Sequence, residues 1–331
     1  MTPKSQKRPK VMVTGATGFV GRHLVDFLHA NQYRVSVYSR QEFSARASCG
    51  LNPEDWFIGE IEDKPALISA CKTADVVVHL ANLAHAGLSD RVRHYSFNVE
   101  GTRFVCEACR EAGTRKLVYV SSALTLSPVR SAYAQSKKLA EEVVFKAASD
   151  AAYSGDEFEA HILRPANIYG PGMKGNIAGL IRGISDRRMP PLPALTNRFA
   201  MVSVYDVCRA IQILIESASV SEHPYLLTDG ELYTPNRVES AIYAALHRRQ
   251  PRWRSPRVIF YLAALVAETF NRLRLGETTV GLRTYHNLVT DSPLRSEGLD
   301  ERLGFSPTRD FEDDLPEILS VLRHVENQRP V

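Results

Sequence analysis

The chain has 331 residues, of which 44% are hydrophobic and 24% charged, enough for one large domain or two smaller ones with a buried core. With 19 glycines and 18 prolines, its composition excludes a fibrous repeat and a wholly disordered chain. The net charge of +4 comes from four basic residues within positions 1–10, so the remaining chain gives no argument for binding nucleic acid. Residues 1–9 are expected to be a disordered basic tail. They are not expected to be a secretion signal, because no apolar segment separates them from the glycine motif that follows.

Five cysteines stand at positions 49, 71, 106, 109 and 208, an odd number without the spacing of a disulfide framework. Cys106 and Cys109 form a lone C-x-x-C with no second pair and no nearby histidine. We therefore expect these cysteines to pack in the core, with no metal site. The cytoplasm is the expected location.

Short β-branched segments alternate with helical patterns in the first half of the chain, as is typical of parallel β/α units. The pattern predicts a Rossmann-type, doubly wound α/β domain over residues 10–170. Strands are predicted over 10–14, 34–38, 56–58, 75–79, 116–121 and 159–163, and helices over 19–30, 91–112 and 132–148.

After Gly170, glycine and proline become frequent, and helical patterns dominate around strands predicted over 201–204 and 225–228. We expect residues 171–331 to form a smaller, mostly helical substrate-binding lobe, from which some strands and helices can return to the first domain.

The longest apolar segment, 258–266, is well short of the roughly 18–20 residues of a membrane span, so no span is expected. It is predicted to be a core helix, with a helix lying on a membrane as the alternative. A basic cluster precedes it and is expected to be a solvated loop, with contact to anionic lipid or phosphate as the alternative. The cluster consists of Arg248, Arg249, Arg252, Arg254 and Arg257.

A glycine motif, T-G-A-T-G-F-V-G, directly follows the first predicted strand and opens the first predicted helix. Gly15 allows a tight turn, Gly18 allows a pyrophosphate to approach the backbone, and Gly21 allows close packing of helix and strand. The N-terminus of the helix then presents free N–H groups to the phosphates. The expected cofactor contacts here are Gly15, Thr17, Gly18, Phe19, Val20 and Gly21.

The second predicted strand lacks the acidic residue that binds the ribose 2′-hydroxyl in an NAD site. Ser39 and Arg40 stand there instead, where a 2′-phosphate would lie. We therefore favour NADP as the cofactor, with NAD as the alternative. An exposed loop arginine without a cofactor role is the other interpretation of Arg40.

Tyr133 and Lys137 are four residues apart in a predicted helix and share one face. The ammonium is expected to lower the pKa of the phenol, so that Tyr133 exchanges a proton with a substrate hydroxyl or carbonyl. Ser122 follows the preceding strand and can hold the same oxygen. The spacing of Tyr133 and Lys137 is common by chance, and the serine upstream strengthens the interpretation.

With these motifs the chain resembles the extended short-chain dehydrogenase/reductase superfamily, in the branch of nucleotide-sugar epimerases and ketoreductases. The resemblance covers nearly the whole chain and includes G-E-I at 59–61, V-H-L-A at 78–81, N-V-E-G-T at 98–102 and L-R-P-A-N-I-Y-G-P-G at 163–172. It implies that Asn98 steadies the active-site helix and that Asn167 and Asn176 hold a nucleotide diphosphate. Further implied contacts are Glu60 and Ile61 to the adenine, Leu80, Ala81 and Pro165 to the cofactor, and Asn82 and Arg198 to the substrate.

Two departures from the family pattern concern the substrate. Only ten residues separate Ser122 from Tyr133, whereas the family has a longer segment that shapes the sugar pocket. The arginine that often clamps the diphosphate falls nearest Phe199, and Arg198, one residue early on a strand, points to the opposite face.

These observations predict an NAD(P)-dependent reductase or epimerase acting on a nucleotide-linked sugar through Ser122, Tyr133 and Lys137, with a homodimer as the expected assembly. The second hypothesis is reduction of an apolar ketone such as a steroid, flavonoid or lipid, and the third is a non-catalytic NADP-binding regulator. Ala123 and Leu124 follow Ser122 where a sugar 4,6-dehydratase places an acidic pair, so that reaction is not expected.

Overall fold

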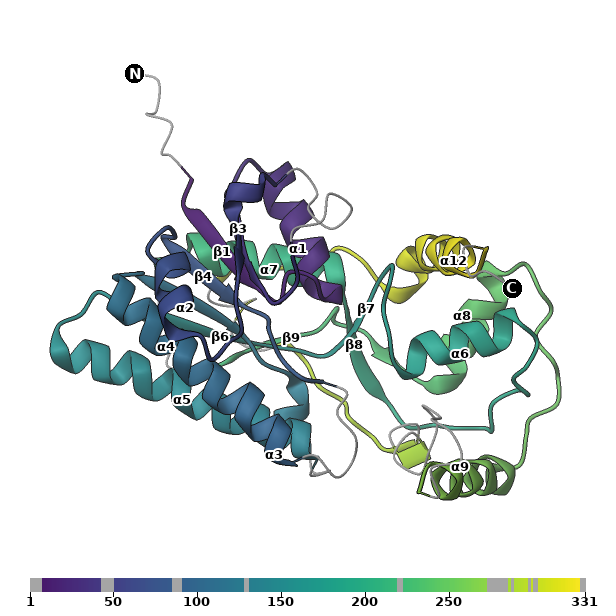
Figure 1. Cartoon of the computed structure of the whole chain (residues 1–331). Helices are drawn as coiled ribbons and strands as arrows, with labels where there is room; N and C mark the ends of the chain where they lie inside the picture. Colours follow the sequence, from purple (N-terminus) through teal and green to yellow (C-terminus); the bar gives the residue numbers. More distant parts are fainter. Residues whose placement is uncertain are drawn as a thin grey trace. The chain divides into compact units, whose positions relative to one another are not determined.

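Figure 1 shows the computed structural model of the chain. It describes residues 8–42, 51–84, 91–127, 131–218, 223–272, 285–286, 289–296, 299 and 303–327. The chain forms two compact units from interleaved stretches. Unit 1 contains Met1–Ala166, Val204–Leu227 and Ser296–Ser306, and unit 2 contains Asn167–Ser203, Thr228–Arg295 and Pro307–Val331.

A seven-stranded sheet, in the order β3-β2-β1-β4-β5-β6-β9, forms the centre of unit 1, and its strands pair in parallel. Continuous apolar sequences such as that of β4 suit a sheet covered on both faces. The strand order reverses between β1 and β4, so the predicted doubly wound Rossmann-type fold is confirmed. The strands are β1 Lys10–Thr14, β2 Arg34–Ser39, β3 Trp56–Ile58, β4 Val76–His79, β5 Lys116–Val120, β6 Glu159–Pro165 and β9 Tyr225–Leu227.

Helices cover this sheet in two groups (Figure 1). The helices α1 (Phe19–Ala30) and α7 (Val204–Glu216) pack against each other, and α4 (Gly101–Ala112) lies between α2 (Lys64–Cys71) and α5 (Ala132–Ser154). The second group buries a cluster that includes three free cysteines, whereas Cys49 lies outside the described residues. The helix predicted over 91–112 consists of α3 Arg91–His94, a π-helical segment η2 Tyr95–Glu100 and α4. Two short 3₁₀ helices are η1 Pro53–Asp55 and η3 Ala123–Leu126.

Unit 2 contains a three-stranded sheet in the order β10-β8-β7. The Asp229 carboxylate accepts hydrogen bonds from the hydroxyls of Tyr169 at 3.1 Å and Tyr233 at 2.8 Å, and burial raises the pKa of Asp229 to about 6. These bonds join β7 and β10 to the loop after β9. The elements are β7 Asn167–Tyr169, β8 Phe199–Ser203, β10 Leu232–Tyr233, α6 Asn176–Ser185, α8 Pro235–Ala245, α9 Arg257–Arg272 and α12 Phe311–Asn327.

The apolar segment 258–266 lies within α9, but the prediction that it forms a core helix is wrong. Most of its large apolar side chains are exposed, for example Val258 at 63% and Val266 at 68%, and Ala264 is buried. Apolar composition predicted the helix correctly, but it could not predict how much of the helix surface other elements cover. Among the described residues, no helix is long and apolar enough to cross a membrane.

Candidate functional site

The turn between β1 and α1 requires glycine at two positions. Gly15 has φ +73°, and a Cβ there would lie 2.6 Å from the backbone nitrogen of Ala81. A Cβ at Gly21 would lie 2.2 Å from the carbonyl oxygen of Gly15. The missing side chains therefore let β1, α1 and the end of β4 approach one another closely.

The N-terminus of α1 differs from those of α2, α5 and α8. No side chain caps it, because its N-cap residue is Gly18 and its first turn contains no acidic residue. In the other three helices, a side-chain oxygen of Asp63, Ser131 or Thr234 accepts a hydrogen bond from the first turn. The first N–H groups of α1 are thus left for an anion, and the turn fits the pyrophosphate of a dinucleotide.

A buried histidine links this turn to the neighbouring strand. His79 Nδ1 lies 2.7 Å from Thr14 Oγ1, and its Nε2 lies 3.2 Å from Thr102 Oγ1. The Thr14 hydroxyl in turn accepts a hydrogen bond of 3.3 Å from the backbone N–H of Ala81, and the Leu80 N–H bonds to the Thr14 carbonyl. Burial lowers the pKa of His79 to about 3, with Lys137 acting in the same direction, so the imidazole is neutral and serves as a positioning group.

The end of β2 brings Arg40 close to Glu60. The Arg40 Nε atom lies 3.8 Å from a Glu60 carboxylate oxygen, both side chains are 63% exposed, and the guanidinium lies 5.6 Å from the ring centroid of Phe97. Ser39 is buried and accepts a hydrogen bond from the backbone N–H of Gln41. Ile61, which is also buried, packs near Gly101 at the start of α4.

Asn98 is buried in the π-helical segment η2, a kind of helix distortion often found at functional sites. Its Oδ1 accepts from the Leu83 N–H at 2.7 Å, and its Nδ2 donates to Ser136 Oγ at 2.9 Å. Ser136 donates in turn to the carbonyl oxygen of Tyr133. Asn98 therefore ties the chain after β4 to the first turn of α5.

The structure brings the side chains of Ser122 and Tyr133 close together. Ser122 ends the loop after β5 and caps η3 by accepting from the Leu124 N–H, and Tyr133 lies in the first turn of α5, which Ser131 caps. Burial raises the pKa of Tyr133 to about 12, and the neighbouring Ser122 hydroxyl acts in the opposite direction. Tyr133 is therefore protonated at neutral pH.

Lys137 is fully buried one turn further along α5. Its ammonium donates to the carbonyl oxygen of Val120 at 2.7 Å and lies 4.5 Å from the ring centroid of Tyr119. Burial lowers the pKa of Lys137 to about 7, and the Glu141 carboxylate opposes this shift. The expected lowering of the Tyr133 pKa by Lys137 is not found, because burial dominates at Tyr133 and Lys137 is bound to Val120 instead.

Two groups around Tyr133 and Lys137 were not predicted from the sequence. The His94 ring lies 6.2 Å from the ring of Tyr133, and its Nδ1 atom is buried without a hydrogen-bond partner. Glu141, two turns beyond Tyr133 on α5, accepts from the hydroxyl of Ser121 and from Arg164, whose Nε lies 2.9 Å away. The spacing of Glu141 from Lys137, four residues on the same helix, was the signal that could have found the second group.

The sequence profile of the NAD-dependent epimerase/dehydratase family matches residues 11–227, which include the glycine turn and the Ser122–Tyr133 pair. The chain belongs to this family. Ceramide reductase of Caulobacter vibrioides is 34% identical over 232 residues, covering 67% of this chain and 68% of that protein. UDP-glucose 4-epimerase of Vibrio cholerae is 27% identical over 278 residues, covering 77% of this chain and 81% of that protein.

A solved structure of MoeE5 in complex with UDP-glucose and NAD has the same fold, with a TM-score of 0.73. The two chains are 22% identical, and the alignment covers 96% of this chain and 99% of MoeE5. This chain is therefore an enzyme of the NAD-dependent epimerase/dehydratase family.

The residues expected to contact substrate in this family member fall in both units. In unit 1, Asn82 Nδ2 donates to the Leu80 carbonyl oxygen at 2.8 Å. In unit 2, Asn167 Nδ2 donates to the Ala200 carbonyl oxygen at 3.4 Å, and Asn176 begins α6 with an exposed side chain. Arg198 is exposed just before β8, where its backbone N–H donates to Asp291 at 2.6 Å.

Proposed function

We propose that this protein is an NAD(P)-dependent reductase or epimerase that acts at a keto or hydroxyl carbon of a nucleotide-linked sugar. The observation that carries the proposal is the placement of Ser122 beside Tyr133, with Lys137 on the next turn of the helix that holds Tyr133. The glycine turn supports it, because His79 joins that turn to the neighbourhood of Lys137. UDP-glucose 4-epimerase of Vibrio cholerae supports the sugar substrate.

Residues of unit 1 would hold the dinucleotide, and a bound nicotinamide would supply the hydride chemistry. The uncapped turn of α1 would bind the pyrophosphate through its N–H groups. Thr17, Phe19 and Val20 are half-buried on this turn, as expected for residues that contact a ligand lying against it. Further proposed contacts are Gly15, Gly18, Gly21, Ser39, Arg40, Glu60, Ile61, Leu80, Ala81, Tyr133, Lys137 and Pro165.

The protonation state of Tyr133 favours the reductive direction. A phenol with a pKa of about 12 keeps its proton at neutral pH and can donate it to the oxygen of a carbonyl group that is being reduced. Ser122 would hydrogen-bond to the same oxygen as charge develops there. Lys137, with a pKa of about 7, can return a proton to Tyr133 at neutral pH. Asn98 acts through Ser136 as a positioning residue for α5.

Polar side chains would hold the nucleotide diphosphate of the substrate. Asn82, Asn167 and Asn176 supply amide groups, and Arg198 supplies a charge that can pair with phosphate. The sugar 4,6-dehydratase reaction stays outside the proposal, because Ala123 and Leu124 after Ser122 have no group that transfers protons.

Reduction of an apolar ketone is the second candidate, and a specific observation favours it. Leu124 and Leu126, in the short segment next to Ser122, expose 39% and 47% of their surfaces. Exposed leucines beside a reacting centre suit an apolar substrate better than a sugar. The identity of 34% with ceramide reductase of Caulobacter vibrioides supports the same candidate.

One experiment separates the candidates. The purified chain is supplied with NADPH and a UDP-4-keto-hexose, with NAD and UDP-glucose, or with NADPH and an oxidised ceramide in detergent micelles. Nicotinamide absorbance and product NMR are followed in each arm. The proposal expects turnover in a sugar arm and none with Tyr133→Phe. Turnover only in the lipid arm supports the second candidate, and cofactor binding without turnover in any arm favours a regulator.

NADP is the proposed cofactor, because an Arg40 guanidinium can pair with a 2′-phosphate. Such a charge-assisted contact contributes about 1.5–3 kcal/mol, which is roughly a ten- to hundredfold preference. Glu60, 3.8 Å from Arg40, competes for the guanidinium and would reduce this preference. We expect Arg40→Asp to reverse the order of affinities measured by titration with NADP and NAD. Arg115→Asp, at an exposed arginine paired with Glu157, is the matched control, and equal affinities in the wild type would refute the assignment.

A further inference from the structure

The helix α9 carries apolar side chains on the side where a surface helix normally carries charges. Val258, Leu262 and Val266 recur every four residues and expose 63%, 51% and 68% of their surfaces, and Ile259 and Leu265 lie beside them with 53% and 40% exposed. The covered side is the opposite one, where Ala264 is buried and Glu268 is half-buried. Phe260 and Ala267 are also half-buried on the covered side, so α9 is apolar nearly all round, whereas an ordinary surface helix has a polar outer face.

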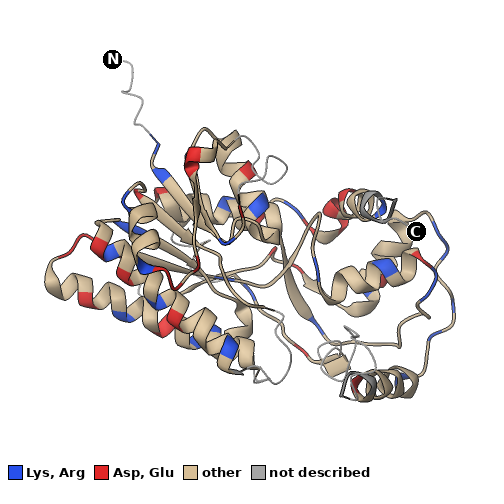
Figure 2. Cartoon of the chain, in the orientation of Figure 1, with Lys and Arg blue, Asp and Glu red and all other residues tan. Residues whose placement is uncertain are grey.

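The segment that leads into α9 is strongly basic. Residues 248–257 contain five arginines and no acidic residue, and Figure 2 shows this charge along the chain between α8 and α9. Three arginines have partners: Arg248 donates to carbonyl oxygens at the end of α6, Arg254 pairs with Glu239, and Arg257 donates to the Ala194 carbonyl oxygen. Arg249 and Arg252 are exposed and have no acidic partner in the described part of the chain.

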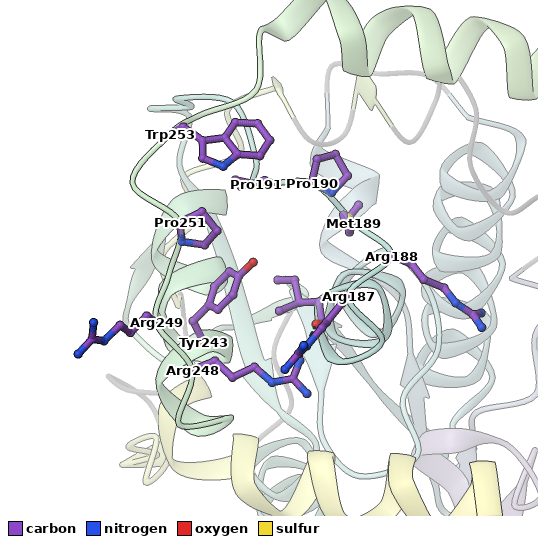
Figure 3. A pocket seen from close by; sticks show the side chains of 11 residues that line it. Arg187, Arg188, Met189, Pro190, Pro191, Tyr243, Arg248, Arg249, Pro251 and Trp253 are labelled. Atoms are coloured by element: carbon purple, nitrogen blue, oxygen red, sulfur yellow. Dashed lines mark hydrogen bonds between the residues drawn. The ribbon is translucent and has the colours of Figure 1, made fainter.

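A shallow cavity of about 510 Å³ lies beside this segment in unit 2. Four arginines line it, Arg187 and Arg188 from the turn after α6 and Arg248 and Arg249 from the segment before α9, as Figure 3 shows. Its lining includes no acidic residue. Trp253, which is 59% exposed, lies at the edge of the cavity four residues before α9 begins. Basic, aromatic and apolar side chains therefore follow one another along the surface.

We propose that α9 and residues 248–257 form a docking surface for an anionic phospholipid bilayer, with α9 lying in the plane of the membrane interface. The apolar face would enter the boundary between headgroups and acyl chains, and the arginines would contact lipid phosphates. Trp253 has the amphipathic ring that favours this boundary. With 16 residues, α9 is about 24 Å long, too short to span the hydrocarbon core.

Charge distinguishes a membrane from a second copy of the chain as the occupant of this face. A twofold dimer through α9 would bring the same patch of each copy together. Each copy would bring Arg249 and Arg252 to that interface, and residues 248–257 contain no acidic residue that could pair with them, which destabilises such an interface. An anionic bilayer complements both the apolar face and the charge, and this argument is independent of the substrate.

The test measures binding of the full chain to phosphatidylcholine vesicles prepared with and without phosphatidylglycerol. We expect cosedimentation with the anionic vesicles, little with the neutral ones, and release by added salt. Leu262→Gln with Val266→Gln should weaken binding at least tenfold, because two apolar side chains no longer enter the interface. Arg249→Gln with Arg252→Gln should weaken it about thirtyfold, from about 1 kcal/mol per arginine. Val92→Gln with Tyr153→Gln, at exposed apolar residues of unit 1, should leave binding unchanged.

A second measurement keeps the test valid if a variant folds poorly. The chain has two tryptophans, and Trp56→Phe leaves Trp253 as the sole reporter. We expect a blue shift of Trp253 fluorescence with anionic vesicles and quenching by brominated lipid. Absent binding, or equal binding to neutral and anionic vesicles, overturns the proposal. Sedimentation of the protein alone provides a third outcome: dissociation of an oligomer by Leu262→Gln with Val266→Gln would assign the face to a second copy and overturn the membrane proposal.

Discussion

The centre around Tyr133 in unit 1 and the surface around α9 in unit 2 depart from the usual distribution of residues in opposite ways. Near Tyr133, groups that are normally solvated are buried, including His79, Asn98 and Lys137. At α9, groups that are normally buried are exposed, including Leu262 and Val266. Each departure costs folding free energy and is informative for that reason.

The difference shows how the two kinds of function are built. Buried polar groups are held at fixed distances by hydrogen bonds, and burial changes their pKa values, which prepares them for proton transfer. Exposed apolar groups gain stability only when a partner covers them, which prepares them for association. Unit 1 therefore carries the proposed chemistry, and unit 2 carries the proposed docking surface.

The largest expected effect tests the centre in unit 1. Tyr133→Phe should lower turnover about 10²–10⁴-fold by removing the proton donor, while cofactor affinity and the melting temperature stay close to wild type. Tyr153→Phe is the matched control, because Tyr153 lies on the same helix with 96% of its surface exposed. Steady-state kinetics with the substrate that is turned over in the three-arm assay measures the effect. Wild-type turnover of Tyr133→Phe would remove Tyr133 from the mechanism.

The next largest effect is expected at the glycine turn, where close packing leaves no room for a side chain at Gly15. Gly15→Ala places a Cβ 2.6 Å from a backbone atom at φ +73°, whereas Gly230→Ala in unit 2 has φ +85° and no atom within 4 Å. Strain at positive φ costs about 1 kcal/mol in both variants. The clash should cost Gly15→Ala about 1–3 kcal/mol more and weaken dinucleotide binding. Denaturant unfolding and cofactor titration measure both effects, and equal losses of stability would contradict the close approach.

The buried histidine predicts a pH dependence of stability. Because the pKa of His79 falls from 6.5 to about 3 in the folded state, the unfolded chain binds more protons than the folded chain between these values. Stability is therefore lost as the pH falls through this range, by about 2 kcal/mol between pH 7 and pH 5 from this one group. His79→Asn should remove that part of the slope, measured by urea unfolding at several pH values. A wild-type slope in His79→Asn would contradict a neutral imidazole in the folded chain.

Much of unit 1 followed from local sequence patterns. Short β-branched segments and helical periodicity gave the strand and helix order, and the bounds 10–14, 19–30 and 56–58 are those of β1, α1 and β3. The short helix α2 escaped prediction, since its eight residues give a weak periodic signal. The glycine turn was predictable because positive φ and close backbone approach restrict the residue type at single positions. Ser122 and Tyr133 lie close together because the fold places the end of a strand beside the start of a helix.

Other features were decided only by the tertiary structure. The sequence placed Lys137 on the face of Tyr133, but the fold binds its ammonium to Val120 and leaves the Tyr133 pKa raised by burial. His94 beside Tyr133 has no sequence signature, and α7 and β9 belong to unit 1 although they follow residue 170. The apolar periodicity of 258–266 specified a helix, because side-chain spacing is local information. Whether other elements cover that helix depends on chain segments far away in the sequence, so only the folded chain determines that α9 is exposed.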